Sequence, residues 1–270
     1  MKKIILSSLI ILCAFVSNIS WSADFDKGLK AYNSEDYLTA INEWRPLAEK
    51  GNLFAQYRLA NMYRGGKGVK QDYDIAMEWY KLAAEQGHIN SQFNLALGYD
   101  LGKGVPQDSK ASLKWYTLAA EQGDSEAQFA TGFMWFNGEG TPKNHKTGIK
   151  WFKLAAEQGH SDSQLTLGLI YGEGNGAIQD YDASFKWAKL AAEQGDFEAQ
   201  GYLARIYAKG YGVIKDYVYS HMWANISSSN GYDVGAELRD LLEKKYMSNL
   251  DISQAQKLAR ECVAKNYKDC

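Results

Sequence analysis

The side chains best suited to catalysis or metal binding are few, and their spacing does not group them. The chain has four histidines: His88, His145, His160 and His221. None of the four has the spacing of metal ligands, and His88 and His160 share a repeated position that carries Asp124 and Asp196 in other copies. That alternation is typical of a turn. HExxH, CxxC, GxSxG and SxxK motifs are absent. We therefore expect no catalytic residues, no metal site and no cofactor.

Two cysteines near the C-terminus are the remaining reactive groups. Cys262 and Cys270 lie eight residues apart. They can form a disulfide that pins the last turn, if the tail folds back until the two Cα atoms are within about 7 Å. Alternatively, Cys262 is a small buried helix residue and Cys270 belongs to a frayed end.

Composition excludes several classes of protein. Of 270 residues, 46% are apolar and 23% charged, which is typical of a folded globular chain. Only three prolines interrupt a sequence rich in helix-forming residues, which favours an all-α fold. The formal net charge is −2, and no basic stripe indicates a nucleic-acid partner.

The first 22 residues have the pattern of a secretory signal peptide. "MKK" is followed by the apolar run "IILSSLIILCAFV" and by small residues before Ala23. The run is shorter than the roughly 20 residues that span a bilayer, although an uncleaved anchor is the alternative. We expect a periplasmic or secreted protein with no membrane span after cleavage, and an oxidising compartment that permits a disulfide.

A period of 36 residues organises most of the chain. The string "LAAEQG" recurs at 82–87, 118–123, 154–159 and 190–195. Pairs of glycines of the form GxG keep the same period, and no strand pattern precedes them, so a turn is favoured over a phosphate-binding loop. A fixed period of this size predicts stacked repeats. One tryptophan column also follows it, Trp79, Trp115, Trp151, Trp187 and Trp223, and Trp44 precedes the first of these by 35 residues.

Each repeat is predicted to contain two helices. In the second, 72–86, the inward stripe is expected at Ile75, Trp79, Leu82, Ala83 and Gln86. The glycine after "LAAEQ" ends this helix, the two alanines allow a close helix crossing, and Asn90 is the expected N-cap of the next helix. The tryptophan column should then be core, so that Trp151→Ala costs about 3–5 kcal/mol.

The first helix of each repeat is expected to pack through the equivalents of positions 55, 56, 59, 60 and 63. These positions stay alike between repeats and cluster on one arc of a helical wheel. One of these columns holds small residues where two helices cross: Ala60, Ala96, Gly132, Gly168 and Ala204.

These residues carry a family resemblance. The segment "AQYRLANMYRGGKGVKQDYDIAMEWYKLAAEQG" resembles the Sel-one-like repeat (SLR) of the tetratricopeptide (TPR) superfamily, in five copies over 51–231. Residues 23–50 resemble a TPR-like helix pair, and 232–270 resemble terminal capping helices. The resemblance implies an all-α fold, a right-handed α-solenoid superhelix of antiparallel helix pairs. Gly201 and "WANISSSNG" depart from the pattern, so the fifth repeat is expected to meet the capping helices.

Function is sought where the repeats differ. Positions equivalent to 58, 61 and 65 vary most, and in this family's superhelix they would line the concave groove. An apolar centre with a polar rim is typical of a protein or peptide groove. Alternatively, these side chains pack first helix against first helix and leave no patch. The expected contacts are Arg58, Asn61, Asn94, Leu97, Leu101, Phe133, Asn137, Leu169, Tyr202 and Arg205.

We thus expect a non-catalytic exported scaffold that binds a protein or peptide, as an envelope adaptor or a host-interaction factor. A glycan ligand and a purely structural oligomer are alternatives. A further alternative is a cell-wall or β-lactam-interacting enzyme, because some cysteine-rich relatives have been described as β-lactamase-like. Those relatives carry cysteine pairs within their repeats, and this chain does not.

Overall fold

The computed structural model describes residues 24–270, which contain 14 helices and no strand. The predicted signal peptide, residues 1–22, lies outside the described residues. Among the helices of residues 24–270, none combines the length and the apolar character needed to cross a membrane.

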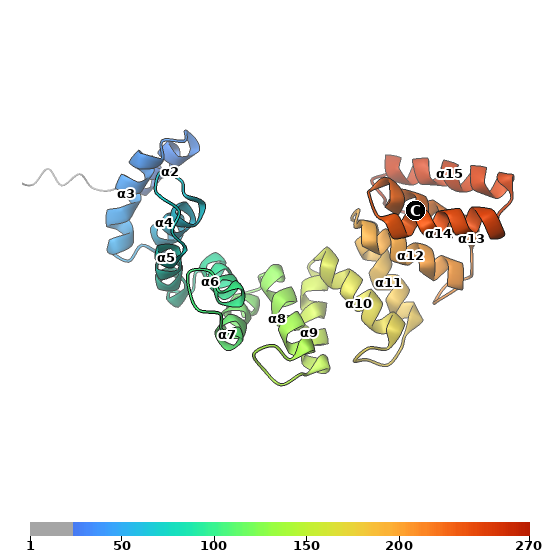
Figure 1. The fold of residues 1–270 in the computed structure, drawn as a ribbon, viewed down its shortest axis with the longest axis horizontal. Coiled ribbons are helices and arrows are strands. Elements are labelled where there is room, and N and C mark those ends of the chain that lie inside the picture. The colour runs from blue at the N-terminus through green and yellow to red at the C-terminus, as the bar shows by residue number, and fades with distance from the viewer. Residues whose placement is uncertain (1–23) are drawn as a thin grey trace, which may run out of the picture. The chain divides into compact units, whose positions relative to one another are not determined.

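Residues 24–107 form the first compact unit. Consecutive helices pack against each other through the whole unit (Figure 1). Its helices are α2 (Phe25–Asn33), α3 (Tyr37–Glu49), α4 (Leu53–Gly65), α5 (Tyr73–Glu85) and α6 (Ile89–Leu101).

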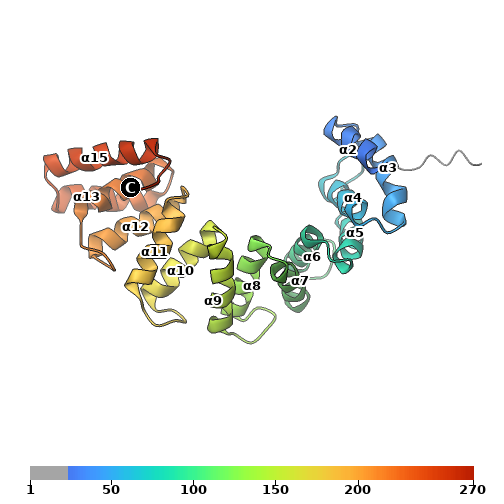
Figure 2. The same cartoon turned by 180° about the vertical axis from the view of Figure 1, so that it is seen from behind.

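Residues 108–270 form the second compact unit. From α7 to α14 each helix packs on the next, and α15 packs against α13 (Figure 2). Its helices are α7 (Ser109–Glu121), α8 (Ser125–Asn137), α9 (His145–Glu157), α10 (Ser161–Glu173), α11 (Tyr181–Ala192), α12 (Phe197–Lys209), α13 (Tyr217–Ser229), α14 (Asp233–Lys245) and α15 (Asn249–Ala264). The all-α solenoid of helix pairs is confirmed.

The first helix of each repeat begins at one column of capping residues. The Asp124 carboxylate accepts a hydrogen bond from the backbone N–H of Ala127, and Nδ1 of His88 accepts one from Ser91. These side chains satisfy donors that the helix leaves unpaired. The prediction of Asn90 as the cap of α6 was wrong, because the cap is His88 and Asn90 lies inside the helix. The column comprises Asn52, His88, Asp124, His160 and Asp196.

The "LAAEQG" string ends the second helix as expected. The glycine after each "LAAEQ" has φ between 88° and 95°, a region that favours glycine. The glutamine has a further role. Nε2 of Gln158 donates to Oε1 of Gln128 at 2.7 Å, and Nε2 of Gln128 donates to the backbone oxygen of Ala120 at 3.1 Å. This glutamine relay joins the end of α9 to α8 and α8 to the end of α7.

The inward stripe of the second helix lies one position away from the predicted one. In α5 the buried side chains are those of Ala76, Met77, Tyr80, Ala83 and Ala84. The prediction was correct for Ala83 and wrong for Leu82 and Gln86, which are exposed. Consecutive side chains of a helix point about 100° apart, so the residue next to a buried one can be partly exposed to solvent.

The tryptophan column is therefore not core in the middle of the chain. Trp79, Trp115, Trp151 and Trp187 are half-buried, and the fully buried residue is the next one, such as Phe152. Trp44 and Trp223 are buried because terminal helices cover them. Nε1 of Trp44 donates to the backbone oxygen of Phe25 in α2, and Trp223 lies in the core cluster that α15 closes.

Small residues permit one close helix contact within a repeat and one close contact between repeats. A Cβ added to Gly132 would lie 2.8 Å from the Phe152 ring, which confirms the predicted small column at the helix crossing. The second glycine of each GxG turn lies against the first residues of the preceding second helix. A Cβ on Gly140 would lie 2.6 Å from the carbonyl carbon of Ser109.

The C-terminal helices cover the fifth repeat. A Cβ at Gly201 would lie 2.9 Å from the Tyr232 ring, so the missing side chain makes room for the residue that precedes α14. Cys262 and Cys270 form a disulfide with a Cα–Cα distance of 5.4 Å. The tail thus folds back after α15, and Tyr267 packs against the core cluster.

Candidate binding groove

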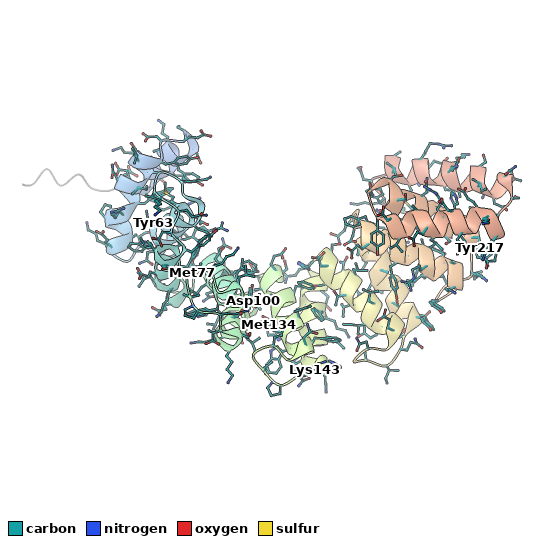
Figure 3. The ribbon with its side chains drawn as sticks, viewed as in Figure 1. Tyr63, Met77, Asp100, Met134, Lys143 and Tyr217 are labelled. Carbon is teal, nitrogen blue, oxygen red and sulfur yellow. A yellow bond between two sulfur atoms is a disulfide. The ribbon has the colours of Figure 1, made fainter. Side chains whose placement is uncertain are left out.

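Five of the expected groove residues lie in the first unit, and three of them, Asn94, Leu97 and Leu101, line a cavity. Leu97 and Leu101 of α6 border a cavity of about 300 Å³ together with Met77 of α5 and Arg64 of α4. Figure 3 labels Met77 and Asp100, which mark the two helices on either side of it. The volume is at the lower end of the range for ligand pockets.

A glycine in the core creates this cavity. Gly98 is buried in α6, and the equivalent positions hold large buried side chains: Met62, Met134, Ile170 and Ile206. Met77 partly fills the vacated space, since its sulfur lies where a Cβ of residue 98 would be. Gly65 likewise presents no side chain at the rim. The cavity therefore results from glycines at positions where other repeats have larger side chains. Comparing residue 98 with its equivalents in the other repeats would have predicted it.

The three polar residues expected in the groove of this unit, Arg58, Asn61 and Asn94, contact other groups of the protein, and only Asn94 lines the cavity. Oδ1 of Asn61 accepts a hydrogen bond from the Tyr80 hydroxyl at 2.8 Å, and burial raises the pKa of Tyr80 to about 12. The Arg58 guanidinium lies 5.9 Å from the centre of the Trp44 ring. Nδ2 of Asn94 donates to the backbone oxygen of Asn90. Arg64 and Lys103 remain as the cations that line the cavity.

The other five expected residues lie in the second unit, where Leu169 is the central one. Leu165 and Leu169 of α10 line a cavity of about 630 Å³ and also a smaller one of about 70 Å³. Phe129 of α8 and Phe197 of α12 complete the apolar lining of the larger cavity. We call this surface the α10–α12 groove. Phe133 is exposed on α8.

Tyr202 lines the smaller cavity but holds its own neighbours together. Its hydroxyl lies 3.0 Å from Oγ of Ser184 and 3.4 Å from the backbone oxygen of Gly168. Burial raises the pKa of Tyr202. Arg205 is exposed, with its guanidinium 5.9 Å from the Tyr202 ring centre. Asn137 is exposed at the end of α8, and its amide contacts Glu139.

The aromatic column at the equivalents of position 57 packs within its own repeat and onto the next cap. Phe129 lies 5.6 Å from Phe152 of α9 and 5.0 Å from His160, measured between ring centres. Tyr57 lies 4.6 Å from His88. Phe129 and Leu165 of this column also line the α10–α12 groove, beside Leu169 and Phe197.

The described residues offer apolar surfaces on which a ligand can dock. No group of three or more His, Cys, Asp or Glu side chains in residues 24–270 could hold a metal ion. An apolar cavity with a few polar groups at its edge accepts an apolar side chain of a ligand.

Comparison with known proteins gives one family and two informative structures. The model of the Sel1 repeat matches residues 53–88, 89–124, 125–160, 161–196 and 197–232. No curated protein matches the chain. A Sel1 repeat protein from Oxalobacter formigenes is 31% identical, with a TM-score of 0.78 over 88% of this chain and 99% of that one.

A second solved structure is of a protective antigen present in uropathogenic Escherichia coli strains, which displays an SLR fold. It is 34% identical, with a TM-score of 0.75 over 86% of this chain. The present chain spans 50% of the length of that protein.

Proposed function

Because this chain belongs to the Sel1 repeat family, we propose that it is a non-catalytic scaffold that binds a protein or peptide through the exposed faces of its first helices. Solenoids of this type offer extended surfaces made from successive repeats. The observation that carries the proposal is that both units have apolar cavities bordered by first-helix residues, Leu97 and Leu101 in one and Leu165 and Leu169 in the other.

The proposal includes export to the periplasm or the medium. Two observations support it: the signal-like pattern in the first 22 residues, and the disulfide between Cys262 and Cys270. Disulfides persist mainly in oxidising compartments. The similar E. coli protein is a protective antigen, which fits a role in contact with a host. Cell fractionation with a C-terminal epitope tag tests export, and a tag retained in the cytosol would contradict it.

The binding role is tested by cross-linking capture from envelope fractions. The variant Leu101→Asp/Phe133→Asp places charge on two first-helix side chains that are 53% and 47% exposed. Its matched control, Leu82→Asp/Leu154→Asp, alters second-helix leucines that are 44% and 42% exposed. We expect the same partner with the wild type and the control and its loss with the first variant. Equal capture by all three proteins would contradict the proposal, provided that circular dichroism shows equal folding.

A further inference from the structure

The α10–α12 groove has a chemical character that the first unit lacks. Its floor is apolar, formed by Phe129, Leu165, Leu169 and Phe197. The two cavities share Leu165 and Leu169, so they are adjoining parts of one surface that runs from α8 across α10 to α12. A surface of this extent accepts a stretch of chain and not only a single side chain.

Exposed carboxylates recur at a single repeated position of the first helices that carry this floor. Glu126, Asp162 and Glu198 are the second residues of α8, α10 and α12, and all three are exposed. The equivalent residues of α4 and α6 are Phe54 and Asn90, so the acidic row belongs to the second unit. Acidic residues stabilise the first turn of any helix, but that effect does not explain why two of these three border the larger cavity.

The charges of the row are largely uncompensated. No side chain within residues 24–270 forms an ion pair with Asp162 or Glu198, and Glu126 lies 3.2 Å from Nε2 of His160. Asp196 also lines the cavity, but Ala199 and Ser161 donate hydrogen bonds to its two oxygens.

One cation adjoins the groove. Arg205 borders the smaller cavity, where its guanidinium lies over the Tyr202 ring. Glu198 also borders that cavity.

We propose that the α10–α12 groove binds an extended peptide segment in which lysine or arginine side chains flank an apolar side chain. The apolar side chain enters the cavity between Leu165, Leu169 and Phe197, and the basic groups approach Asp162 and Glu198. The proposal rests on the proposed function and names the chemistry of its ligand. Opposite charges across an interface mainly steer association and select the partner. The same row of carboxylates repels nucleic acids and anionic lipid surfaces.

The test uses the full chain with methyl-labelled leucine in nuclear magnetic resonance titrations. The probes are three peptides of equal length in a glycine-serine context, with a central Lys-Leu-Lys, Glu-Leu-Glu or Lys-Ser-Lys. We expect the Lys-Leu-Lys peptide to shift the methyl signals of Leu165 and Leu169 and to bind more tightly than the other two. Raising the salt concentration should weaken the binding of the Lys-Leu-Lys peptide.

Variants that remove negative charge from the acidic row test whether these carboxylates cause the preference for a basic peptide. Asp162→Asn/Glu198→Gln should lower the affinity for the Lys-Leu-Lys peptide by about tenfold, since each exposed ion pair contributes up to about fivefold to affinity. The matched control is Glu157→Gln, an exposed carboxylate at the end of α9, and it should leave affinity unchanged. All these positions are at the surface, so folding is preserved.

Each remaining outcome decides a different question. Equal binding of the Glu-Leu-Glu peptide, or unchanged affinity in the double variant, would overturn the assignment of a basic ligand while leaving a peptide groove in place. No shift of Leu165 or Leu169 with any peptide would overturn this groove as the site. The capture experiment with Leu101→Asp/Phe133→Asp would then still decide the proposed function by itself.

Discussion

His88 caps α6 with an imidazole where Asn52 and Asp124 cap the equivalent helices. Nδ1 accepts hydrogen bonds from Ser91, so the cap requires the neutral ring. Burial, and to a smaller extent the charge of Arg58, lower the pKa of His88. The contribution of the cap to stability is therefore complete above the unfolded-state pKa of about 6.5 and is lost as pH falls through the lower folded-state value.

The variant His88→Asn should remove this pH dependence, because the amide oxygen accepts a hydrogen bond at every pH. An N-cap contributes about 1 kcal/mol. Between pH 7.5 and pH 5, the wild type should lose up to about that much more free energy of unfolding than the variant. Urea unfolding at the two pH values measures the difference. Parallel losses in both proteins would show that the imidazole cap is not responsible.

Two adjacent residues of α9 differ in burial, so their substitution by alanine should lower the free energy of unfolding by different amounts. Phe152 is fully buried, so Phe152→Ala should cost about 3–5 kcal/mol. Trp151 is half-buried, so Trp151→Ala should cost roughly half as much, because less apolar surface returns to water. Urea unfolding of the two variants checks the order. A larger loss of free energy of unfolding for Trp151→Ala than for Phe152→Ala would show that the tryptophan column belongs to the core.

At the scale of elements, the glutamine relay predicts that substitutions of its two glutamines lower the stability by different amounts. Gln128→Leu removes the partner of both the Ala120 carbonyl and the Gln158 amide, and Gln128 is buried. An unpaired buried polar group costs about 1–3 kcal/mol. Gln158→Leu changes an exposed residue and should cost less. Denaturant unfolding of both variants checks this, and similar losses would mean that the relay does not join the helices.

Most of the elements could be predicted from the sequence, because the repeats supply many observations of one pattern. The helix pairs, the small crossing column and the glycine stops follow from periodicity and backbone chemistry. The orientation of the second helix could not be fixed in this way. Leu82 and Trp79 are as apolar as Met77 and Tyr80, so hydropathy alone cannot separate two faces about 100° apart.

The candidate site was only partly predictable. Variable first-helix positions pointed to Leu97, Leu101 and Leu169, which do line cavities. Tyr202 was expected as an anchor for a ligand, but its hydroxyl contacts Ser184 and Gly168. Such a contact between repeats depends on three-dimensional packing that no single column reveals. The cavity at Gly98 was available to column comparison and was missed.

At the scale of the molecule, stability should be shared only between neighbours. Helices pack mainly on those next to them in sequence, so a defect weakens nearby repeats most. In Phe152→Ala, hydrogen exchange should accelerate most in α8 to α11 and less in α15. Amides of α2 and α3, in the other compact unit, should be unaffected. A uniform acceleration over the chain would instead indicate a single cooperative fold.

The turn glycines have a consequence for how such a chain evolves. Gly140 and Gly212 meet the backbone at the start of the preceding second helix, and not a particular side chain. Gly104 likewise meets the backbone of Tyr73 first, whereas Gly176 meets the side chain of His145. Where the junction is made of backbone it does not depend on the side chains of the preceding repeat, so unequal recombination that adds or deletes a repeat in frame at such a junction preserves it. Gene length can change by whole repeats, while substitutions at the exposed first-helix positions diversify what each new copy recognises.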